Sequence, residues 1–212
     1  MDHESRHQCL IYEGPPSQKL PMLTAMIRQK LDEGYRCLYL NSPPMVAGIR
    51  SYLAAKGMDV ANEIAKARLV LSAEPTAPGN SFNIDQMLSK LEDALDQALN
   101  DGYKGLWATG DITWEFGPEK DFSRLVEYEW RLEDLFHKRP ELSGICQYHR
   151  DTLPRAVMQQ GLLMHRTIFI NETLSRINPH YTQSGLSAEQ RTTNAELDEM
   201  VTALCQLEDT KS

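Results

Sequence analysis

The chain has 212 residues, of which 41% are hydrophobic and 25% charged, a composition that suits one large globular domain with a full core. Its 30 acidic and 22 basic residues give a formal net charge of −8 without any cluster of Lys and Arg, so direct binding to nucleic acid is not expected. The apolar runs are too short to cross a membrane, the N-terminal segment lacks a signal-peptide pattern, and four widely spaced cysteines predict reduced thiols in a cytoplasmic protein.

Strand-like and helix-like segments alternate along the chain. Short apolar runs that end in turn residues predict strands, and longer segments with apolar residues every three or four positions predict helices. In chain order the predicted elements are strand Gln8–Glu13, helix Leu20–Glu33, strand Arg36–Leu40, helix Met45–Lys56, strand Leu69–Ser72, helix Asp85–Asn100, strand Gly105–Thr109, helix Phe122–His137, strand Ser143–Tyr148, helix Pro154–Met164 and strand Thr167–Asn171. This alternation predicts an α/β fold with a mainly parallel central sheet and helices on both faces.

The character of the sequence changes near residue 183. Residues 183–194 are polar and predict a linker, whereas Ala195–Leu207 carries apolar residues at helical spacing among acidic ones. We therefore expect an α/β domain over residues 1–182, followed by a linker and a C-terminal helix over residues 183–212. This helix either packs on the domain or binds a protein partner or a second copy of the chain.

In parallel sheets, ligands bind where the loops at the carboxyl ends of the strands converge. At the first such loop a P-loop enzyme has a glycine-rich turn and then Lys and Ser or Thr, so that backbone N–H groups surround the phosphates. Here the turn is Gly14–Pro16 (GPP), with Glu13 before it, and Lys19 is followed by Leu20. The prolines have no N–H to donate, and Glu13 brings a negative charge to the place where a phosphate would lie. We therefore predict no efficient ATP hydrolysis through this loop.

Other candidate residues stand at the ends of later strands. Asp111 follows an apolar strand, as the Walker B aspartate of P-loop ATPases does, but an aspartate at this place is also often a cap or turn residue. Four aromatic residues near strand ends either line a mostly apolar ligand pocket or pack loops onto the sheet: Tyr12, Trp114, Phe116 and Tyr148.

Histidine and cysteine side chains occur near two of the strands, at His7 and Cys9 and again at Cys146 and His149. If the two strands were neighbours, these four side chains could in principle surround zinc. However, His7 begins its strand and His149 follows the end of the other, which would separate them by roughly 15 Å. We therefore predict buried core thiols and no metal site or cofactor.

The segment His7–Tyr12 (HQCLIY) reproduces the HxCxxY signature of the MEDS domain, a sensory domain named for methanogens, methylotrophs and the regulator DcmR. The chain also resembles this family in Gly34–Leu40, Gly110–Trp114 and Gly144–Arg150, so that the similarity covers roughly residues 6–181. The resemblance implies a degenerate RecA- or KaiC-like ATPase fold without a functional Walker A loop. It also implies a role in sensing hydrocarbon derivatives, usually beside a DNA-binding or histidine-kinase module. No helix-turn-helix or kinase segment is visible in this sequence.

The sequence thus favours a non-catalytic sensory domain that binds a small molecule at the carboxyl ends of the strands and contributes to transcription regulation. Its output would pass through a regulator, a kinase or a homo-oligomer formed by the C-terminal helix. One alternative is a residual nucleotide-binding protein or slow NTPase that uses Lys19, Asp111 and Arg150, and another is a protein-interaction scaffold. The predicted ligand-binding residues are His7, Cys9, Tyr12, Asp111, Thr113, Trp114, Tyr148 and His149.

Overall fold

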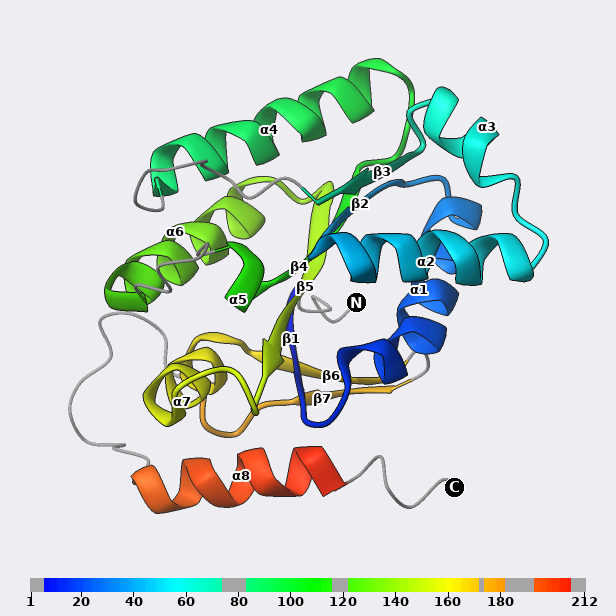
Figure 1. Ribbon diagram of the computed structural model, residues 1–212. Helices are drawn as coiled ribbons and strands as arrows, with labels where there is room; N and C mark the ends of the chain where they lie inside the picture. Colours follow the sequence, from blue (N-terminus) through cyan, green and yellow to red (C-terminus); the bar gives the residue numbers. More distant parts are fainter. Residues whose placement is uncertain (1–5, 74–82, 116–121, 172–173, 182–192, 207–212) are drawn as a thin grey trace.

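A computed structural model describes residues 6–73, 83–115, 122–171, 174–181 and 193–206 of the chain (Figure 1). The described strands are β1 (His7–Tyr12), β2 (Arg36–Leu40), β3 (Leu69–Ser72), β4 (Leu106–Asp111), β5 (Leu142–His149), β6 (Thr167–Asn171) and β7 (Leu174–Ile177). The described helices are α1 (Leu20–Asp32), α2 (Pro43–Ala55), α3 (Val60–Ala65), α4 (Ile84–Asn100), α5 (Ile112–Glu115), α6 (Leu125–Lys138), α7 (Arg155–Met164) and α8 (Asn194–Gln206), with the 3-10 turns η1 (Pro16–Lys19) and η2 (Phe122–Arg124). None of these helices is long and apolar enough to span a membrane.

The strands form one sheet in the order β3-β2-β4-β5-β1-β6-β7. All neighbouring pairs run parallel except β6 and β7, which are antiparallel. The first strand of the chain therefore lies inside the sheet, between β5 and β6. The α/β class and the mainly parallel sheet predicted from the sequence are confirmed.

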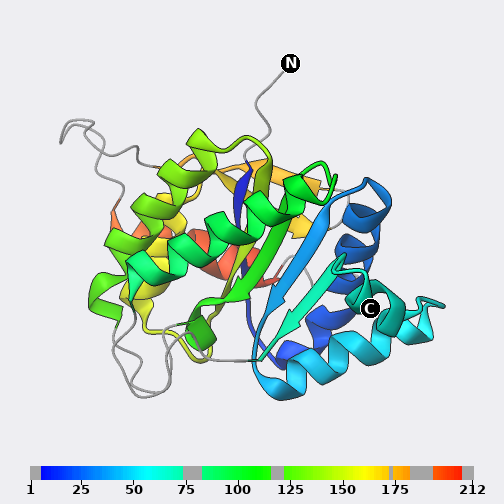
Figure 2. The same ribbon diagram turned by 90° about the horizontal axis from the view of Figure 1, so that it is seen from above.

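Helices cover both sides of the sheet, and each side has its own apolar core (Figure 1 and Figure 2). We call the side covered by α4, α6 and α7 the α6 face, and the side covered by α1, α2 and α3 the α1 face. Because side chains alternate along a strand, β1 contributes Cys9 and Ile11 to the α6 face and Leu10 and Tyr12 to the α1 face.

Helix α8 lies against α7 and β1. It begins with a capping box, in which the Thr193 N–H donates to the Glu196 carboxylate and the Glu196 N–H donates to the Thr193 hydroxyl. Its apolar stripe is buried in the core of the α6 face and consists of Leu197, Val201, Leu204 and Cys205. The apolar side of this helix is thus occupied by contacts within the chain. Almost all of the predicted linker before it lies outside the described residues.

Each predicted strand and helix has a counterpart in the structure, with shifts of a few residues at the ends. Three further elements were not predicted, namely α3, α5 and β7. Helices α3 and α5 have six and four residues, too short to show a helical apolar pattern. All four residues of the edge strand β7 are exposed, so it lacks the alternation that reveals a half-buried strand.

Candidate functional site

The HxCxxY segment on β1 sends its polar side chains to opposite faces of the sheet. The backbone of β1 pairs in register with β5, so that His7 lies opposite Gly144 and Tyr12 opposite His149. His7 shares the α6 face with Cys9, whereas Tyr12 belongs to the core of the α1 face. The segment therefore contributes to two separate groups of polar residues.

The first group lies in the core of the α6 face and comprises His7, Glu129, Cys146 and His165, which we call the His–Cys–Glu cluster. One donor atom from each side chain lies within 4.8 Å of the others, and all four residues are buried. His7 Nε2 lies 3.3 Å from Cys146 Sγ, 3.0 Å from His165 Nε2 and 3.4 Å from Glu129 Oε2. The four residues come from β1, α6, β5 and the junction of α7 with β6. They could hold a metal ion.

A second set of contacts surrounds the cluster and orients its side chains. His7 Nδ1 lies 2.8 Å from Glu133 Oε2, and His165 Nδ1 lies 2.7 Å from the carbonyl oxygen of Gly161. Phe136 stacks on the His7 ring, with ring centroids 4.7 Å apart. The Tyr148 hydroxyl donates a hydrogen bond to Glu129 Oε1. Both imidazole rings are thus fixed through Nδ1, and both Nε2 atoms point into the cluster.

Burial governs the electrostatics of this group. Desolvation raises the pKa of the Glu129 carboxyl, although His7 and the Tyr148 hydroxyl act in the opposite direction. Desolvation, together with the neighbouring His7, holds the pKa of His165 well below its usual value, so His165 is neutral at pH 7. Burial also raises the pKa of the Cys9 thiol and, with Glu129, that of the Tyr148 hydroxyl, so both stay protonated.

The second group lies at the carboxyl edge of the sheet around Tyr12, and we call it the Tyr12 network. The Tyr12 hydroxyl donates to Asp111 Oδ2 over 3.3 Å, and the Tyr12 ring stacks on His149 with centroids 4.8 Å apart. Lys19 Nζ also lies over the Tyr12 ring, 5.5 Å from its centroid. Burial, followed by the nearby Asp111, raises the pKa of Tyr12. Tyr12 thus links a cation to a buried carboxylate.

The same network fixes the turn that follows β1. His149 Nε2 lies 2.8 Å from the Gly14 carbonyl oxygen, and its Nδ1 lies 3.2 Å from the Thr152 hydroxyl, which contacts Thr113. The Gly14 N–H donates to the Asp151 carboxylate over 2.9 Å. The N–H of Gly14 in this turn is therefore bound by a carboxylate of the chain itself.

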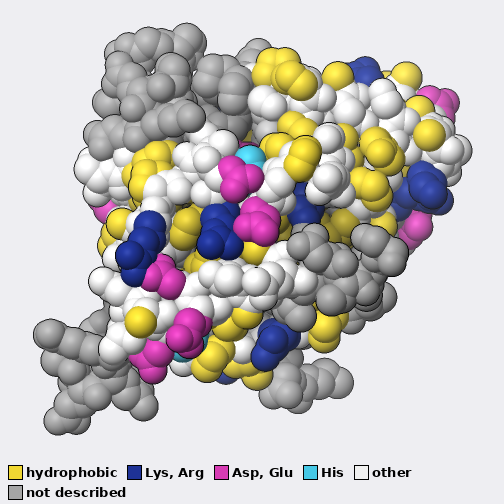
Figure 3. Space-filling model, turned by 60° about the horizontal axis from the view of Figure 1, so that its bottom comes forward, with side chains coloured by type: hydrophobic (Ala, Val, Ile, Leu, Met, Phe, Trp, Pro, Cys, Tyr) yellow, Lys and Arg dark blue, Asp and Glu magenta, His cyan; other side chains and the backbone are white. Residues whose placement is uncertain are grey.

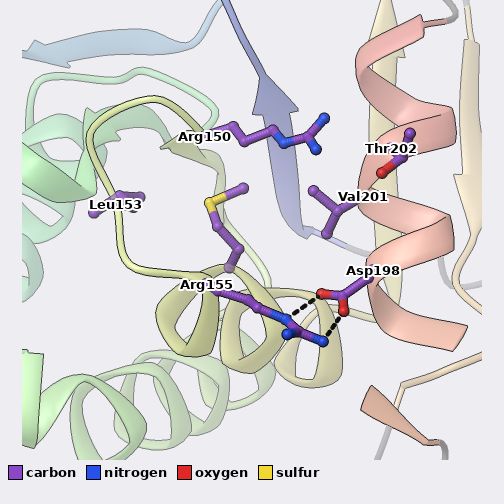
Figure 4. A pocket seen from close by; sticks show the side chains of 7 residues that line it. Arg150, Leu153, Arg155, Asp198, Val201 and Thr202 are labelled. Atoms are coloured by element: carbon purple, nitrogen blue, oxygen red, sulfur yellow. Dashed lines mark hydrogen bonds and ion pairs between the residues drawn. The ribbon is translucent and has the colours of Figure 1, made fainter. Parts of the chain in front are cut away.

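A cavity of about 380 Å³ lies beside this edge, between the end of β5, α7 and α8 (Figure 4). Arg155 on α7 reaches across to Asp198 on α8, with Nε 2.8 Å from Oδ1 and a second contact from Nη2 to Oδ2. Arg150 pairs with Glu13, 3.0 Å away. The lining residues are Arg150, Leu153, Arg155, Met158, Asp198, Val201 and Thr202. Basic and acidic side chains are interspersed on the face of the molecule that Figure 3 shows.

Residues 6–166 match the family described as MEDS, MEthanogen/methylotroph, DcmR Sensory domain. The chain belongs to the MEDS family. Because this is a family of sensory domains, membership indicates a sensory or regulatory role. No curated protein matches the chain. Among solved structures, the chain is similar to an uncharacterized protein from Pyrococcus horikoshii crystallised in complex with an unknown peptide, with a TM-score of 0.60, 16% identity and 82% of each chain covered. At this identity the likeness concerns the fold alone.

The structure distributes the predicted ligand residues of this MEDS domain over both groups. His7 belongs to the His–Cys–Glu cluster, Tyr148 contacts it and Cys9 is buried on the same face. The other four described residues, Tyr12, Asp111, Thr113 and His149, belong to the Tyr12 network. Tyr12 and Tyr148 are both almost fully buried on opposite faces, so they do not line one aromatic pocket. The side chain of Trp114 and the whole of Phe116 lie outside the described residues.

Of the side chains considered for zinc from the sequence, Cys146 lies in the cluster with His7, whereas Cys9 and His149 do not. His7 and Cys146 do meet, but His149 lies at the other end of β5 next to Tyr12, and the partners that complete the cluster are Glu129 and His165. One signal was available for Glu129, because it stands among Leu125, Tyr128 and Leu132 on the apolar side of its helix. His165 ends a helix and gives no comparable signal.

Proposed function

We propose that this MEDS domain is a non-catalytic sensor that binds a small molecule at the carboxyl edge of the sheet and transmits the signal through α8. The observation that carries this proposal is the cavity between β5, α7 and α8. Its volume of about 380 Å³ is within the range of small-molecule sites, and its lining combines apolar side chains with two arginines. The sensory character of the family supports the same role.

The lining defines the chemistry of the expected ligand. Leu153, Met158 and Val201 offer an apolar wall, and Arg155 offers a planar guanidinium that binds carboxylates and similar groups through two hydrogen bonds. A ligand with a short apolar body and an anionic head would fit both. Its head would compete with Asp198 for Arg155, which now joins α7 to α8. A ligand shifts a conformational equilibrium only if it binds the two conformations with different affinities. Competition for Arg155 would make the ligand bind more tightly to the conformation in which the Arg155–Asp198 pair is broken.

Transmission through α8 rests on the burial of that helix. Its apolar stripe packs in the core of the α6 face, so a partner or a second copy of the chain can bind this stripe only after α8 has moved. Release of the Arg155–Asp198 pair would lower the cost of that movement. The regulator, kinase or homo-oligomer expected from the sequence would then recognise the ligand-bound state of the domain.

The absence of catalysis is part of the proposal, together with descent from a RecA- or KaiC-like ATPase. Gly14 is the residue of the turn with a positive φ, 76°, and its N–H is bound to Asp151. Pro15 and Pro16 have no N–H to offer. The arrangement of strand β1, turn and helix is compatible with a P-loop ancestor, but the Gly14 N–H binds a carboxylate of the chain itself.

The test is a thermal-shift screen of short-chain carboxylates and of halogenated and methylated hydrocarbon derivatives against the whole chain. A ligand present at about 100 times its Kd stabilises a protein by about 2.7 kcal/mol, or roughly 5–10 °C in a domain of this size. Arg155→Ala should abolish the shift caused by an anionic ligand. Arg50→Ala, an exposed arginine of α2, is the matched control and should keep it. A shift that survives Arg155→Ala would place the ligand elsewhere.

One observation favours residual nucleotide binding as a second candidate. Lys19 and Asp111 both contact Tyr12 at the carboxyl edge, where P-loop proteins hold the phosphates and magnesium. Isothermal titration with ATP and magnesium tests this function directly. Heat of binding that disappears in Lys19→Ala would support it, and no heat at millimolar ATP would remove it.

A further inference from the structure

The two imidazoles of the His–Cys–Glu cluster face each other with their lone pairs. The Gly161 carbonyl can only accept, so His165 carries its proton on Nδ1 and has a lone pair on Nε2. The Glu133 carboxylate likewise accepts from His7 Nδ1, which leaves the lone pair of His7 on Nε2. Yet the two Nε2 atoms lie only 3.0 Å apart. Two lone pairs at this distance repel each other unless a cation lies between them.

Two further atoms that can bind a metal ion lie next to the two imidazoles. Cys146 Sγ is 3.3 Å from His7 Nε2, and Glu129 Oε2 is 3.4 Å from His7 Nε2 and 3.6 Å from His165 Nε2. Zinc bonds of about 2.0–2.3 Å at tetrahedral angles separate neighbouring ligand atoms by about 3.3–3.6 Å. Three of these spacings match a tetrahedral ion and that between the two Nε2 atoms, 3.0 Å, is shorter, while all four atoms lie within 4.8 Å of one another, so an ion would draw the more distant donor atoms inward.

Glu129 supplies an independent sign of a missing partner. Its Oε1 accepts from Tyr148, but its Oε2 is buried and, among the described residues, accepts no hydrogen bond. A buried carboxylate oxygen without a partner is costly. A divalent cation bound by one thiolate, one carboxylate and two neutral imidazoles has no net charge, which suits a site without solvent.

We propose that His7, Glu129, Cys146 and His165 bind one zinc ion in a closed tetrahedral site. Binding converts the Cys146 thiol to a thiolate, whose proton leaves to solvent as the sulfur–zinc bond forms; a proton carried by Glu129 would leave in the same way. Glu133 and the Gly161 carbonyl orient the two imidazoles through their Nδ1–H groups, as outer partners of zinc histidines commonly do. All four positions are filled by the protein, so the ion has no place for a reacting water.

The site would join four parts of the fold that are distant in sequence. His7 belongs to β1, Cys146 to β5 and Glu129 to α6, and His165 follows α7. Zinc would thus tie the strand that carries the HxCxxY segment to the helices of the α6 face. This inference does not depend on a ligand in the cavity beside α8.

A buried proton is the rival occupant of the space between the imidazoles. A proton on His7 Nε2 would donate to His165 Nε2 and place a positively charged imidazolium next to Glu129 and Glu133. This arrangement satisfies the same contacts but binds no metal. The two cases are separated by metal content and by the spectrum of a bound cobalt ion.

The experiment uses the whole chain without a histidine tag, purified from cells and also refolded in the presence of zinc or cobalt. Elemental analysis should find about one zinc per chain. The cobalt form should show the intense visible bands of a tetrahedral ion and a near-ultraviolet thiolate-to-cobalt charge-transfer band. Cys146→Ser should lose the charge-transfer band, whereas Cys37→Ser, a buried thiol on the α1 face, should keep it.

Two outcomes would overturn the site. The first is wild-type protein that contains no zinc and takes up neither metal on refolding, as the buried proton predicts. The second is a charge-transfer band that persists in Cys146→Ser. If Cys146→Ser does not fold, the single variants Cys9→Ser, Cys37→Ser and Cys205→Ser decide instead, because all three must then retain the band, and loss of the band in one of them contradicts the assignment.

Discussion

The two faces of the sheet bury polar groups in different ways. The α6 face encloses His7, Glu129, Cys146 and His165 among apolar side chains under α6 and α7. The α1 face is largely apolar; it buries the neutral pair Gln147 and Thr109, joined by a hydrogen bond of 2.8 Å, and gathers Lys19, Asp111 and His149 around Tyr12 at the carboxyl edge. The α6 face is thus built around an internal cluster of ionisable side chains, whereas the α1 face keeps its ionisable groups around Tyr12 at its edge.

This difference arises from a single strand. Alternate residues of β1 serve the two faces, so the HxCxxY spacing sends the first two named residues to one face and the tyrosine to the other. A buried polar group needs partners with fixed geometry, because an unmatched donor or acceptor costs more than a lost apolar contact. We therefore expect the α6 face to tolerate small changes less well than the α1 face.

The largest difference is expected for a pair of helical glycines, one on each face. A Cβ at Gly161 in α7 would lie 2.6 Å from Cζ and 2.9 Å from Cδ1 of Tyr148, a fully buried ring. A Cβ at Gly48 in α2 would lie 2.6 Å from a terminal methyl of Leu20, which can rotate away. Gly161→Ala should cost about 3 kcal/mol of stability through overpacking. Gly48→Ala should cost less than about 1 kcal/mol, since alanine favours the helix.

Urea denaturation of both variants measures this contrast. If the two substitutions have equal costs, the ring of Tyr148 is not held more rigidly than the side chain of Leu20. The contrast between the faces would then be lost at this position.

A smaller difference is expected for two buried tyrosines that donate to carboxylates. Tyr148→Phe leaves Glu129 Oε1 without its donor in a fully buried position, which should cost about 2 kcal/mol. Tyr12→Phe removes a longer bond to Asp111, 3.3 Å, and should cost less than about 1 kcal/mol. Equilibrium unfolding monitored by circular dichroism gives both values. A greater loss of stability in Tyr12→Phe would show that the α1 face is more sensitive than the α6 face to removal of such a hydrogen bond.

The smallest effect is expected at the rim of the His–Cys–Glu cluster. Glu133 is partly exposed and accepts from His7 Nδ1, so Glu133→Ala should cost about 1 kcal/mol. Glu133→Gln keeps an acceptor oxygen and should cost about half as much. Comparing the two unfolding curves measured at pH 7 tests whether the acceptor, rather than the charge, orients His7. Equal losses would show that the charge matters more.

Much of this fold follows from local patterns in the sequence. Apolar runs such as Arg36–Leu40 and Leu69–Ser72 give the strands with their bounds, since both turns and alternation are local properties. The position of Asp111 at a strand end and the Gly14–Pro16 turn after β1 are visible in the same way.

The His–Cys–Glu cluster could not be predicted, because it depends on which strands are neighbours. His7 meets Cys146 only because β1 pairs with β5, and His165 only because β6 lies on the other side of β1. The sequence separations are 139 and 158 residues. Spacing within one segment contains no information on such pairings, so the sequence did not point to His165 as a partner of His7.

The inner position of β1 has a consequence for biosynthesis. Of the described strands, this one is made first, yet both of its neighbours, β5 and β6, begin at least 130 residues later. At about 5–20 residues per second, its apolar segment waits on the order of 10 s without the strands that pair with it. Contacts so distant in sequence also slow folding. The nascent chain should therefore depend on chaperones until β6 has emerged, and the α6 face should be among the last parts of the domain to form.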